Sequence, residues 1–554
     1  MIALAARPST CATADDVTTH TLLNCLVREV SGPEGQLTLD GHHLIIRLPR
    51  RDVLLRARVR RRSMTGAHRY EGAVQEIQHG CWTDAGWRRV AALVAEELEL
   101  RTGEANPEFV DQVVESHTAM AAGLAARGPA DDDLDYLASE QSLVYGHRFH
   151  PTPKGRSGSA AQWLPFAPEA GARVRLRHLG VPRELIREEA IGASPLAPLD
   201  AADHAVLPVH PWQFDLLRSH PELRDALRDG RIVDHGEAGG DPVVPTASVR
   251  TLWHPELNVF LKFSLNLRIT NCIRKNADYE LRGAVALTRL LAPVAQDLGR
   301  RFPGTTVLAE PAYRTLDLGN RDLVEGFGII VRDALPVAPG VTPLLAGAIA
   351  DEHPTSPAQA GALIERAGGD PLDWWRAYLA LVVPPVLHAY FHHGVVFEPH
   401  LQNVVIGVAD NGRPQQVFLR DMEGTKLLPA RHAATLRDLP DDVQRQITYD
   451  AQRGWNRVVY CLIVNHVAEV LAAVADRWPS LERDLWDEVA ARLDAYAHEY
   501  GSSPQLRALL SGVPLPAKAN LLIRWERRAD RHAGYLALPS PFAAPRRESR
   551  EVAR

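Results

Sequence analysis

The chain has 554 residues and a formal net charge of −6, and 45% of its residues are hydrophobic and 23% charged. This composition excludes disorder as the main state, and the length predicts two to four domains, because one hydrophobic core stops growing at roughly 250–300 residues. The acidic balance argues against a nucleic-acid partner, since nucleic-acid-binding proteins usually carry a basic excess.

The first part of the chain is predicted to be an N-terminal domain over residues 1–140 that mixes strands and helices. Residues 37–39 and 44–46 are two short strands around an Asp40-Gly41 turn. Residues 47–62 contain eight arginines, and their alternation with apolar residues is typical of a strand with one solvated face. An apolar period of 3.6 predicts helices over 87–102 and 111–126.

The middle part, over residues 141–340, opens with a basic loop rich in proline and glycine at 146–158. Two paired strands are predicted at 247–253 and 259–265. A long helix is predicted to follow at 278–298. This part therefore adds a second sheet to the chain.

The last part, over residues 341–538, is predicted to begin with a buried helix at 374–393 that is kinked at Pro384-Pro385. A hairpin joins 403–408 to 416–419, and long helices follow at 441–475 and 481–500. The composition of 539–554 predicts a disordered tail. Because strands and helices do not alternate regularly, we expect an α+β fold rather than a doubly wound sheet.

The cysteines and the hydropathy pattern indicate where the protein works. The five cysteines are scattered, odd in number and never spaced as C-x-x-C, which argues against a disulfide framework or a structural zinc site. The longest apolar run noted, 377–386, is shorter than the ~20 residues that span a bilayer, and residues 1–6 are too short for a signal segment. We therefore expect a soluble cytoplasmic protein with no membrane partner.

The ends of the predicted hairpin carry the strongest chemical signal. The hairpin brings Asn403 and Asp421 together although they are eighteen residues apart in sequence. Amide and carboxylate oxygens at one point suit Mg²⁺ and leave room for phosphate oxygens. The alternative is a polar hairpin end that faces water. Five polar side chains gather there, namely Glu398, His400, Asn403, Asp421 and Glu423.

Cationic and hydroxyl side chains on the two paired strands of the middle part suit phosphate. Strand alternation predicts Ser248 and Arg250 on one face, with Thr251 beside them and Lys262 opposite on the partner strand. Arginine binds phosphate oxygens as a fork and lysine as a point charge. A solvent-exposed lysine is the alternative reading of Lys262 alone.

Two further segments suit anions. Thr270 or Asn271 can cap the helix that follows, and a helix N-terminus near Arg274 attracts a carboxylate. Basic residues of the 146–158 loop, including His150, Lys154 and Arg156, suit a polyanionic substrate. Ordinary capping and a solvated basic loop remain the alternatives.

Several well-known motifs do not occur in the sequence. These are the G-x-x-x-x-G-K-[ST] phosphate loop, a G-x-G-x-x-G after a strand and the G-x-S-x-G nucleophile elbow. A P-loop NTPase, a Rossmann dehydrogenase and an α/β-hydrolase are therefore disfavoured.

Taken in order along the chain, these segments resemble the NRPS-independent siderophore synthetases, the aerobactin-synthetase-like family. The resemblance spans most of the chain. It departs from the family pattern at Pro399 and Met422, and neither departure removes a polar group. The matching segments are 24–29, 146–158, 210–213, 248–251, Lys262, 270–274, 398–403, 421–424 and 516–522.

The resemblance implies an architecture and a reaction. It implies a hand-like arrangement of thumb, fingers and palm, with the site between fingers and palm, and a homodimer. It implies ATP- and Mg²⁺-dependent adenylation of citrate or a related polycarboxylate, followed by condensation with an amine, hydroxylamine or alcohol and release of AMP and pyrophosphate.

The resemblance also assigns roles to residues. Ser248, Arg250, Thr251 and Lys262 would hold the triphosphate, and Asn403, Asp421 and Glu423, with Glu398 nearby, would hold magnesium and nucleotide. The carboxylates of the substrate would contact Thr270, Asn271, Arg274 and His400 together with His150, Lys154 and Arg156. Catalytic roles would fall to Lys262, Arg274 and His400.

Two alternative functions share these residues. A kinase-like phosphotransferase could use the same Asn and Asp as metal ligands and would release ADP, but no Asp base of the H-R-D type precedes Asn403. A non-catalytic binding protein on the same scaffold would need a lost metal ligand, and none is lost. The sequence leaves the identity of the acid, the nucleophile and any general base open.

Overall fold

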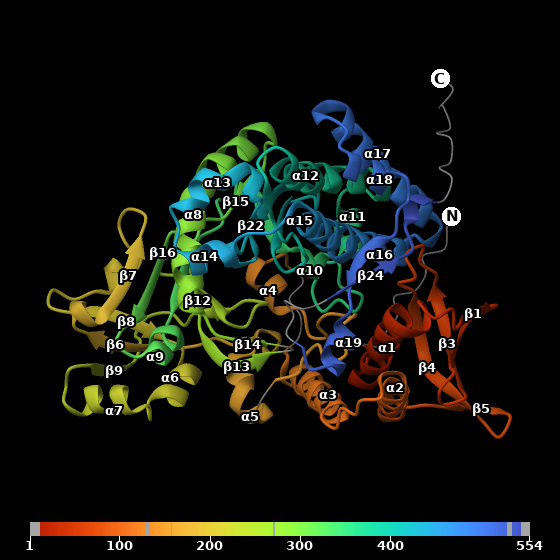
Figure 1. The fold of residues 1–554 in the computed structure, drawn as a ribbon, viewed down its shortest axis with the longest axis horizontal. Helices are drawn as coiled ribbons and strands as arrows, with labels where there is room; N and C mark the ends of the chain where they lie inside the picture. The colour runs from red at the N-terminus through yellow and green to blue at the C-terminus, as the bar shows by residue number, and fades with distance from the viewer. Residues whose placement is uncertain (1–11, 129–132, 157, 270–271, 529–533, 544–554) are drawn as a thin grey trace.

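The computed structural model describes residues 12–128, 133–156, 158–269, 272–528 and 534–543. Within them the fold is α+β, as predicted. Figure 1 shows the first part of the chain at one end of the long axis and strands β6 to β9 at the other. The C-terminal helices lie above both.

The first part is a five-stranded antiparallel sheet covered by helices. The strands are β1 (Leu37–Asp40), β2 (His43–Leu48), β3 (Val53–Arg61), β4 (Arg69–Gln78) and β5 (Cys81–Asp84), in that order. Helices α1 (Ala14–Leu26), α2 (Trp87–Thr102) and α3 (Phe109–Ala126) pack with it, and their core includes Leu521 and Trp525 of α19 (Asn520–Trp525). The C-terminal end of the chain therefore completes the N-terminal core.

The predicted solvated face of β3 is confirmed in part. Arg58 and Arg60 are exposed, whereas Leu55, Ala57 and Val59 are buried, as alternation requires. Arg61 departs from the prediction, because it is buried and forms ion pairs with Asp476 and Glu482 at 2.7 and 2.6 Å. These partners are more than 400 residues away in sequence, so a local pattern could not predict them.

A six-stranded sheet forms the middle part. Its order is β10 (Val244–Pro245), β11 (Thr251–His254), β12 (Val259–Phe263), β17 (Ile329–Asp333), β16 (Ala312–Leu316) and β7 (Ile186–Ala190). A three-stranded sheet of β8 (Ala205–Val209), β6 (Arg177–Val181) and β9 (Val233–Glu237) lies beside it, and helix α8 (Asp278–Arg301) follows. The predicted pairing of the two strands is confirmed, with Thr251 opposite Lys262.

The predicted first strand at 247–253 is wrong at its beginning. Residues 247–250 form a turn in which the Val249 amide donates to the Thr246 carbonyl at 2.9 Å, and β11 starts only at Thr251. The positions of Ser248 and Arg250 are therefore not set by strand alternation. They are set by the turn, in which the Ser248 hydroxyl accepts the Thr251 amide at 3.1 Å.

The predicted hairpin is confirmed as β20 (Val404–Ala409) and β21 (Pro414–Leu419). Strand β18 (Val341–Leu345) flanks one side, and β15 (Thr305–Val307) pairs in parallel with β21 on the other. Since β15 precedes residue 340, the sheet that carries the hairpin draws a strand from the middle part of the chain.

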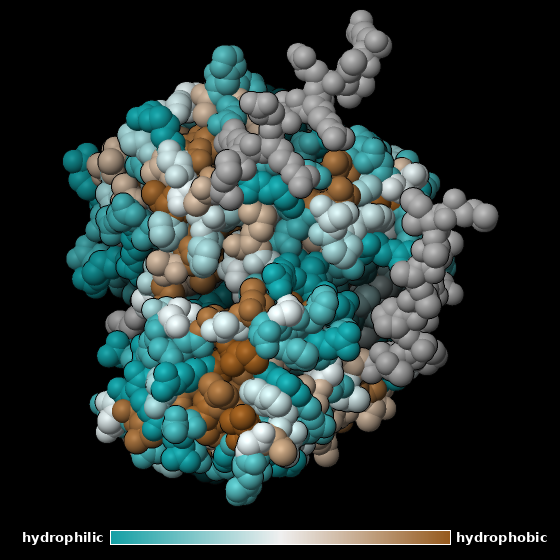
Figure 2. All heavy atoms as spheres, turned by 90° about the vertical axis from the view of Figure 1, so that its right-hand side faces the viewer, coloured by the Kyte–Doolittle hydropathy of each residue, from teal (hydrophilic) through white to brown (hydrophobic). Residues whose placement is uncertain are grey.

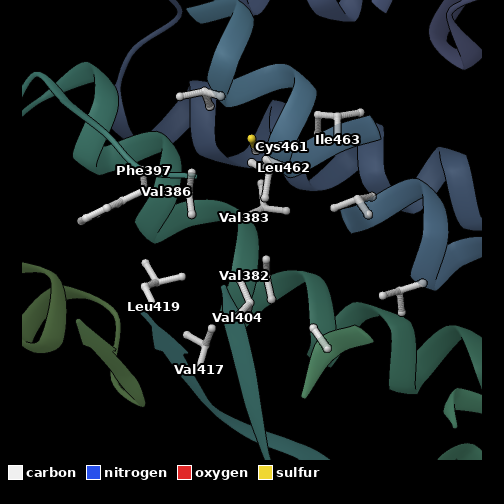
Figure 3. Close-up of a cluster of buried hydrophobic side chains, with 14 of the residues drawn as sticks. Val382, Val383, Val386, Phe397, Val404, Val417, Leu419, Cys461, Leu462 and Ile463 are labelled. Atoms are coloured by element: carbon white, nitrogen blue, oxygen red, sulfur yellow. The ribbon is translucent and has the colours of Figure 1, made fainter. Parts of the chain in front are cut away.

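The largest core surrounds α12 (Pro371–Phe391), which was predicted as a buried helix. Figure 3 shows Val382, Val383 and Val386 of α12 between the hairpin residues Val404 and Val417 on one side and Leu462 on the other. This packing fixes the hairpin against the C-terminal helices and so positions its polar ends.

The predicted helix over 441–475 is broken into two. α14 (Asp441–Gln446) ends, and Asp450 then caps a new helix by accepting the Arg453 amide at 2.8 Å. The new helix runs through α15 (Ala451–Val458), the π-helical η7 (Val459–Val467) and α16 (Ala468–Arg477). Helix α17 (Glu482–Tyr500) follows and confirms the last predicted helix.

One helical stretch among the described residues, Ala451–Arg477, is long and apolar enough to cross a membrane. In the sequence this stretch is not a continuous apolar run, because Asn465, His466 and Glu469 interrupt it. Within its most apolar window 89% is buried inside the protein, which is typical of a core helix. Figure 2 shows that polar residues cover much of the face on the side of the first part, with apolar residues scattered among them in several places.

The remaining elements are short. The predicted disordered tail is described only to residue 543, where Pro541–Ala543 form one 3₁₀ turn, and residues 544–554 lie outside the described part.

The other helices are α4 (Tyr136–Gln141), α5 (Ala160–Trp163), α6 (Pro211–Leu217), α7 (Pro221–Arg228), α9 (Arg321–Gly326), α10 (Ala346–Ile349), α11 (Ala360–Arg366), α13 (Pro429–Arg437) and α18 (Pro504–Leu510). The other strands form three pairs, β13 (Leu265–Ile269) with β14 (Cys272–Arg274), β19 (Val395–Val396) with β22 (Lys426–Leu427), and β23 (Leu515–Lys518) with β24 (Tyr535–Leu538).

Candidate functional site

A buried lysine lies at the centre of the site. Lys262 of β12 is 3% exposed, and its Nζ lies 2.6 Å from Asp421 Oδ1 and 2.8 Å from Glu423 Oε2. The structure therefore brings together, at one ammonium group, residues from the middle sheet and from the end of the hairpin. The alternative of a solvent-exposed lysine is excluded by its burial.

Two arginines flank Lys262 and complete a charged cluster. Arg250 Nη2 lies 2.7 Å from Glu423 Oε2, and Arg332 Nη2 lies 3.3 Å from Asp421 Oδ1. Arg332 is on β17, where alternation puts it on the same sheet face as Lys262. Arg332 also pairs with the fully buried Glu310 at 2.6 Å. We call Arg250, Lys262, Arg332, Glu310, Asp421 and Glu423 the charged cluster.

Asn276 holds Arg250 in place. It is fully buried, its Oδ1 accepts from Arg250 Nη1 at 2.7 Å, and its Nδ2 donates to the carbonyls of Lys262 and Gly328 at 3.0 Å each. The amide thus uses both of its ends, and fixes the guanidinium relative to the strand that carries Lys262.

The backbone is strained at two positions of the site. Val249 has φ 69° and Asp421 has φ 84°, in the left-handed region that non-glycine residues rarely adopt. Such a conformation costs about 1–3 kcal/mol at each residue and persists only where the surroundings enforce it. The strain fixes the turn that carries Arg250 and directs the Asp421 carboxylate toward Lys262.

The charges of the cluster stabilise one another. Burial alone would raise the pKa of Asp421, but Lys262 and then Arg332 hold the pKa well below its usual value. Glu423 is lowered to a pKa of about 2, because Lys262 and Arg250 overcome the effect of burial. Burial would lower the pKa of Lys262, and the two carboxylates raise it instead. All three side chains are therefore charged at neutral pH.

A fourth carboxyl group, besides Glu310, Asp421 and Glu423, lies next to the charged cluster. Burial and then the charge of Glu423 raise the pKa of Glu280, in the first turn of α8, to about 7. Glu280 accepts the Ala277 amide at 2.8 Å, which anchors it at the start of the helix. Sequence reasoning did not single out Glu280.

The hairpin end places the other predicted metal ligands beside the cluster. The Asn403 carbonyl accepts the Arg420 amide at 3.1 Å, and its side-chain amide donates to the Glu398 carbonyl at 3.2 Å. The Glu398 carboxylate pairs with Arg457 at 3.1 Å. Asn403 and Asp421 are therefore neighbours, as predicted, while Glu398 already has a cationic partner.

His400 lies in the loop before Asn403, near carboxylates on one hand and cationic groups on the other. Burial lowers its pKa to about 4, while the charges of Glu398 and Asp421 act to raise the pKa and those of Lys518 and His147 to lower it. The ring is therefore uncharged at neutral pH. It can accept or donate a hydrogen bond to a substrate, whereas its low basicity makes it a weak general base.

Lys518 of β23 is a half-buried cation that was not assigned a role from sequence. No salt bridge to it is formed within the described part of the chain, and its Nζ lies 6.0 Å from the Tyr460 ring centroid. Its charge acts to lower the pKa of His400. The segment 516–522 was recognised as part of the family pattern, but its lysine was not read as a ligand.

The basic loop divides between the site and the interior. His147 reaches the surroundings of His400, whereas Arg156 pairs with Glu169 at 2.7 Å and Lys154 lies 3.5 Å from the same carboxylate. His150 is buried, and its Nδ1 accepts the Thr152 amide at 3.2 Å. Lys154 and Arg156 thus have an internal partner, which excludes the alternative of a solvated loop for these two residues, and their predicted role toward substrate remains a prediction.

Of the predicted carboxylate-binding residues near α8, Thr270 and Asn271 lie outside the described residues. Arg274 is half-buried on β14, and its carbonyl lies 3.4 Å from Arg250 Nη1. This places the Arg274 backbone beside the charged cluster. Arg332, Glu310 and Asn276 were missed because their contacts to the cluster come from strand pairing and not from a local motif.

Comparison with known proteins shows the family of this chain. Residues 135–351 match the IucA / IucC family, and residues 372–533 match the family described as ferric iron reductase FhuF-like transporter. The L-2,3-diaminopropanoate–citrate ligase of Staphylococcus aureus is 31% identical over 70% of this chain and 71% of its own length. The chain belongs to the IucA/IucC family of siderophore synthetases.

Other relatives extend over nearly the whole chain. The rhizobactin siderophore biosynthesis protein RhbC of Rhizobium meliloti is 29% identical over 96% of each chain. The ATP-bound aerobactin synthetase IucA from Klebsiella pneumoniae superposes with a TM-score of 0.85 over 95% of this chain and 99% of its own, at 24% identity. The fold is therefore shared from end to end with a solved siderophore synthetase.

Proposed function

We propose that this chain is an ATP- and Mg²⁺-dependent ligase that adenylates a carboxylate of citrate or a related polycarboxylate and joins it to an amine. The observation that carries the proposal is Lys262, which is buried between Asp421 and Glu423 with Arg250 and Arg332 on either side. Family membership supports it, since curated relatives include ligases of citrate with diaminopropanoate, spermidine and ornithine.

The charged cluster suits the triphosphate because its cations are already held in place. Arg250, Lys262 and Arg332 each pair with a carboxylate, which holds their charges in a buried site where phosphate oxygens can replace those partners. Fixed cations that need no reorganisation stabilise the charge that develops at phosphorus during adenylyl transfer. Ser248 and Thr251 add hydroxyls at the same turn.

The donor set also fits magnesium. The Asp421 and Glu423 side chains present carboxylates and remain 25% and 32% exposed, and Asn403, whose backbone carbonyl accepts the amide of Arg420 next to Asp421, carries a side-chain amide oxygen of the kind that magnesium binds. Magnesium takes a few oxygen ligands from protein and completes its shell with water and phosphate. When bound, it would neutralise phosphate charge, while the freed Lys262 and Arg250 turn to the same phosphates.

The carboxylate substrate would bind next to the charged cluster. Arg274 and Lys518 would supply cationic charge to it, and the uncharged His400 would supply a hydrogen bond. Attack by the amine on the acyl-adenylate then needs mainly positioning, because AMP is already a good leaving group. Thumb, fingers and palm, a homodimer and a cytoplasmic location belong to the same proposal.

The test is pyrophosphate release with ATP, Mg²⁺, citrate and hydroxylamine, omitting each in turn and separating AMP from ADP. We expect AMP, pyrophosphate and a hydroxamate, all dependent on citrate. ADP with a phosphorylated acceptor would instead establish the kinase-like alternative, and ATP binding without any turnover across citrate, citrate monoamides and α-ketoglutarate would establish the binding-protein alternative.

A further inference from the structure

A second group of ligand-type side chains lies far from the charged cluster, where the end of α8 meets the end of α12. Asp297 Oδ2 accepts from His393 Nε2 at 2.9 Å and lies 3.6 Å from His388 Nε2. A helix rises about 1.5 Å per residue, so Asp297 lies about 25 Å along α8 from Glu280 at the charged cluster. This group is therefore separate from the proposed nucleotide site.

The three side chains converge on one point. One ligand atom from each of Asp297, His388 and His393 lies within 4.8 Å of the other two, and no other such group of three His, Cys, Asp or Glu occurs among the described residues. Ligand atoms about 2.0–2.2 Å from a common centre are a little more than 3 Å apart. A shift of about 1 Å in a side chain would bring the three to that geometry.

His388 is the observation that points to a ligand. It is 3% exposed, and its Nε2, the ring nitrogen that faces the group, lies 3.6 Å from Asp297 Oδ2, which is too long for a hydrogen bond. Leaving a buried polar group unsatisfied is unfavourable. The ring is also held in orientation, because His392 stacks on it with ring centroids 4.1 Å apart and Tyr500 contacts it edge-on at 5.0 Å.

Two arginines beside the group oppose a cation but do not occupy the same atoms. Arg300 and Arg301 approach Asp297 Oδ1 at 3.4 and 3.6 Å, whereas both histidines face Oδ2. Their side chains are 72% and 43% exposed, so solvent screens them and they can move away. Oδ2 remains available to a metal ion.

We propose that Asp297, His388 and His393 form a binding site for a divalent transition metal ion of the zinc type. Two imidazoles and one carboxylate are ligands that Zn²⁺ takes in tetrahedral sites, with a fourth position left for water. The bound ion would join α8, which starts at the charged cluster, to the last turn of α12. It would thereby stabilise the folded chain without taking part in the proposed reaction.

The test is equilibrium dialysis of the full chain against Zn²⁺ in excess Mg²⁺, together with thermal unfolding with and without Zn²⁺. The variants are Asp297→Asn and His393→Gln, and the matched control is His498→Gln, which removes an exposed histidine of α17. We expect one more tightly bound Zn²⁺ per chain in the wild type and the control than in the variants. The variants should bind at that site at least tenfold more weakly and lose the rise in Tm.

Equal zinc content and an equal Tm shift in wild type, Asp297→Asn and His393→Gln would overturn the proposal. Titration of the wild type with Co²⁺ gives a second readout that does not depend on how a variant folds. A visible absorption band of four-coordinate Co²⁺ that Zn²⁺ displaces is the expected result, and its absence would also overturn the proposal.

Discussion

Two buried networks of ion pairs in this protein differ in what surrounds them. In the charged cluster, Lys262 is held between carboxylates that remain partly exposed, and Asp421 has a left-handed backbone. In the second network, which we call the Asp476 clamp, Arg61 and Arg69 of the N-terminal sheet pair with Asp476 of α16 at 2.7 and 2.9 Å, and with Glu482 and Glu352 at 2.6 Å each.

In the clamp, the backbone is unstrained and the arginines are closed to solvent. Arg61 and Arg69 lie on regular strands, their side chains are 4% and 0% exposed, and Asp476 is within a helix. Burial of matched charges on regular elements joins two parts of the chain. In the charged cluster, the paired carboxylates lie on a strained backbone and their side chains are partly exposed, so a ligand can reach them. Backbone strain and partial exposure are typical of binding sites, and this difference favours the charged cluster as the site that binds a ligand.

The largest effect is expected from Lys262→Gln. The substitution removes the charge that two carboxylates share, and loss of one fixed charge at a reacting phosphate lowers the rate by roughly 10²–10³-fold. ATP-dependent pyrophosphate release measures this change, and circular dichroism confirms that the variant is folded. A folded variant with a near-normal rate would remove Lys262 from the site.

Asp476→Ala should break the Asp476 clamp. It leaves Arg61 and Arg69 each with one carboxylate instead of two, and uncompensated buried charge destabilises by about 3–5 kcal/mol. Urea unfolding measures the loss, and the rate per folded molecule should be unchanged. The control is Arg477→Ala on the same helix, which breaks an exposed pair with Glu365 and should cost less than about 1 kcal/mol. Equal losses in the two variants would contradict the distinction.

The charged cluster should make the free energy of unfolding depend on pH in the acid range. The pKa of Glu423 is lowered from 4.5 to about 2, so its contribution is present above pH 4.5 and is lost as pH falls through about 2. Glu423→Gln should therefore be less stable than wild type at pH 7, by roughly 1–2 kcal/mol after discounting for partial exposure. The difference should shrink toward pH 2 in urea unfolding across this range, and a constant difference would be the contrary result.

The smallest effect is expected at Tyr378→Phe. The Tyr378 hydroxyl bonds His466 Nε2 at 2.6 Å, and His466 Nδ1 donates to the Pro399 carbonyl at 2.8 Å, which holds the loop that carries His400. Loss of one buried hydrogen bond should cost about 1 kcal/mol and shift KM for the carboxylate more than kcat. Unchanged stability and KM would show that the loop does not depend on this link.

The sequence by itself determined the elements whose pattern is local. The period of α2, the alternation of β3 and the Asp-Asn-Gly turn of the β20–β21 hairpin follow from neighbouring residues, and so does the juxtaposition of Asn403 and Asp421 at its ends. The ordered motifs also identified the family, the residues Arg250, Lys262, Asp421 and Glu423, and the kind of chemistry they suit.

Only the tertiary structure decided the partners. The turn at Val249, the burial of Arg61, the pairing of Arg156 with Glu169 and the approach of Arg332 to Asp421 join segments that are distant in sequence or depend on a backbone that the surroundings enforce. Long-range pairing and burial decide whether a given arginine faces solvent, another part of the chain or a ligand, because the same side chain suits all three. The physical reason is that charge compensation depends on distance and desolvation, and a linear sequence specifies neither.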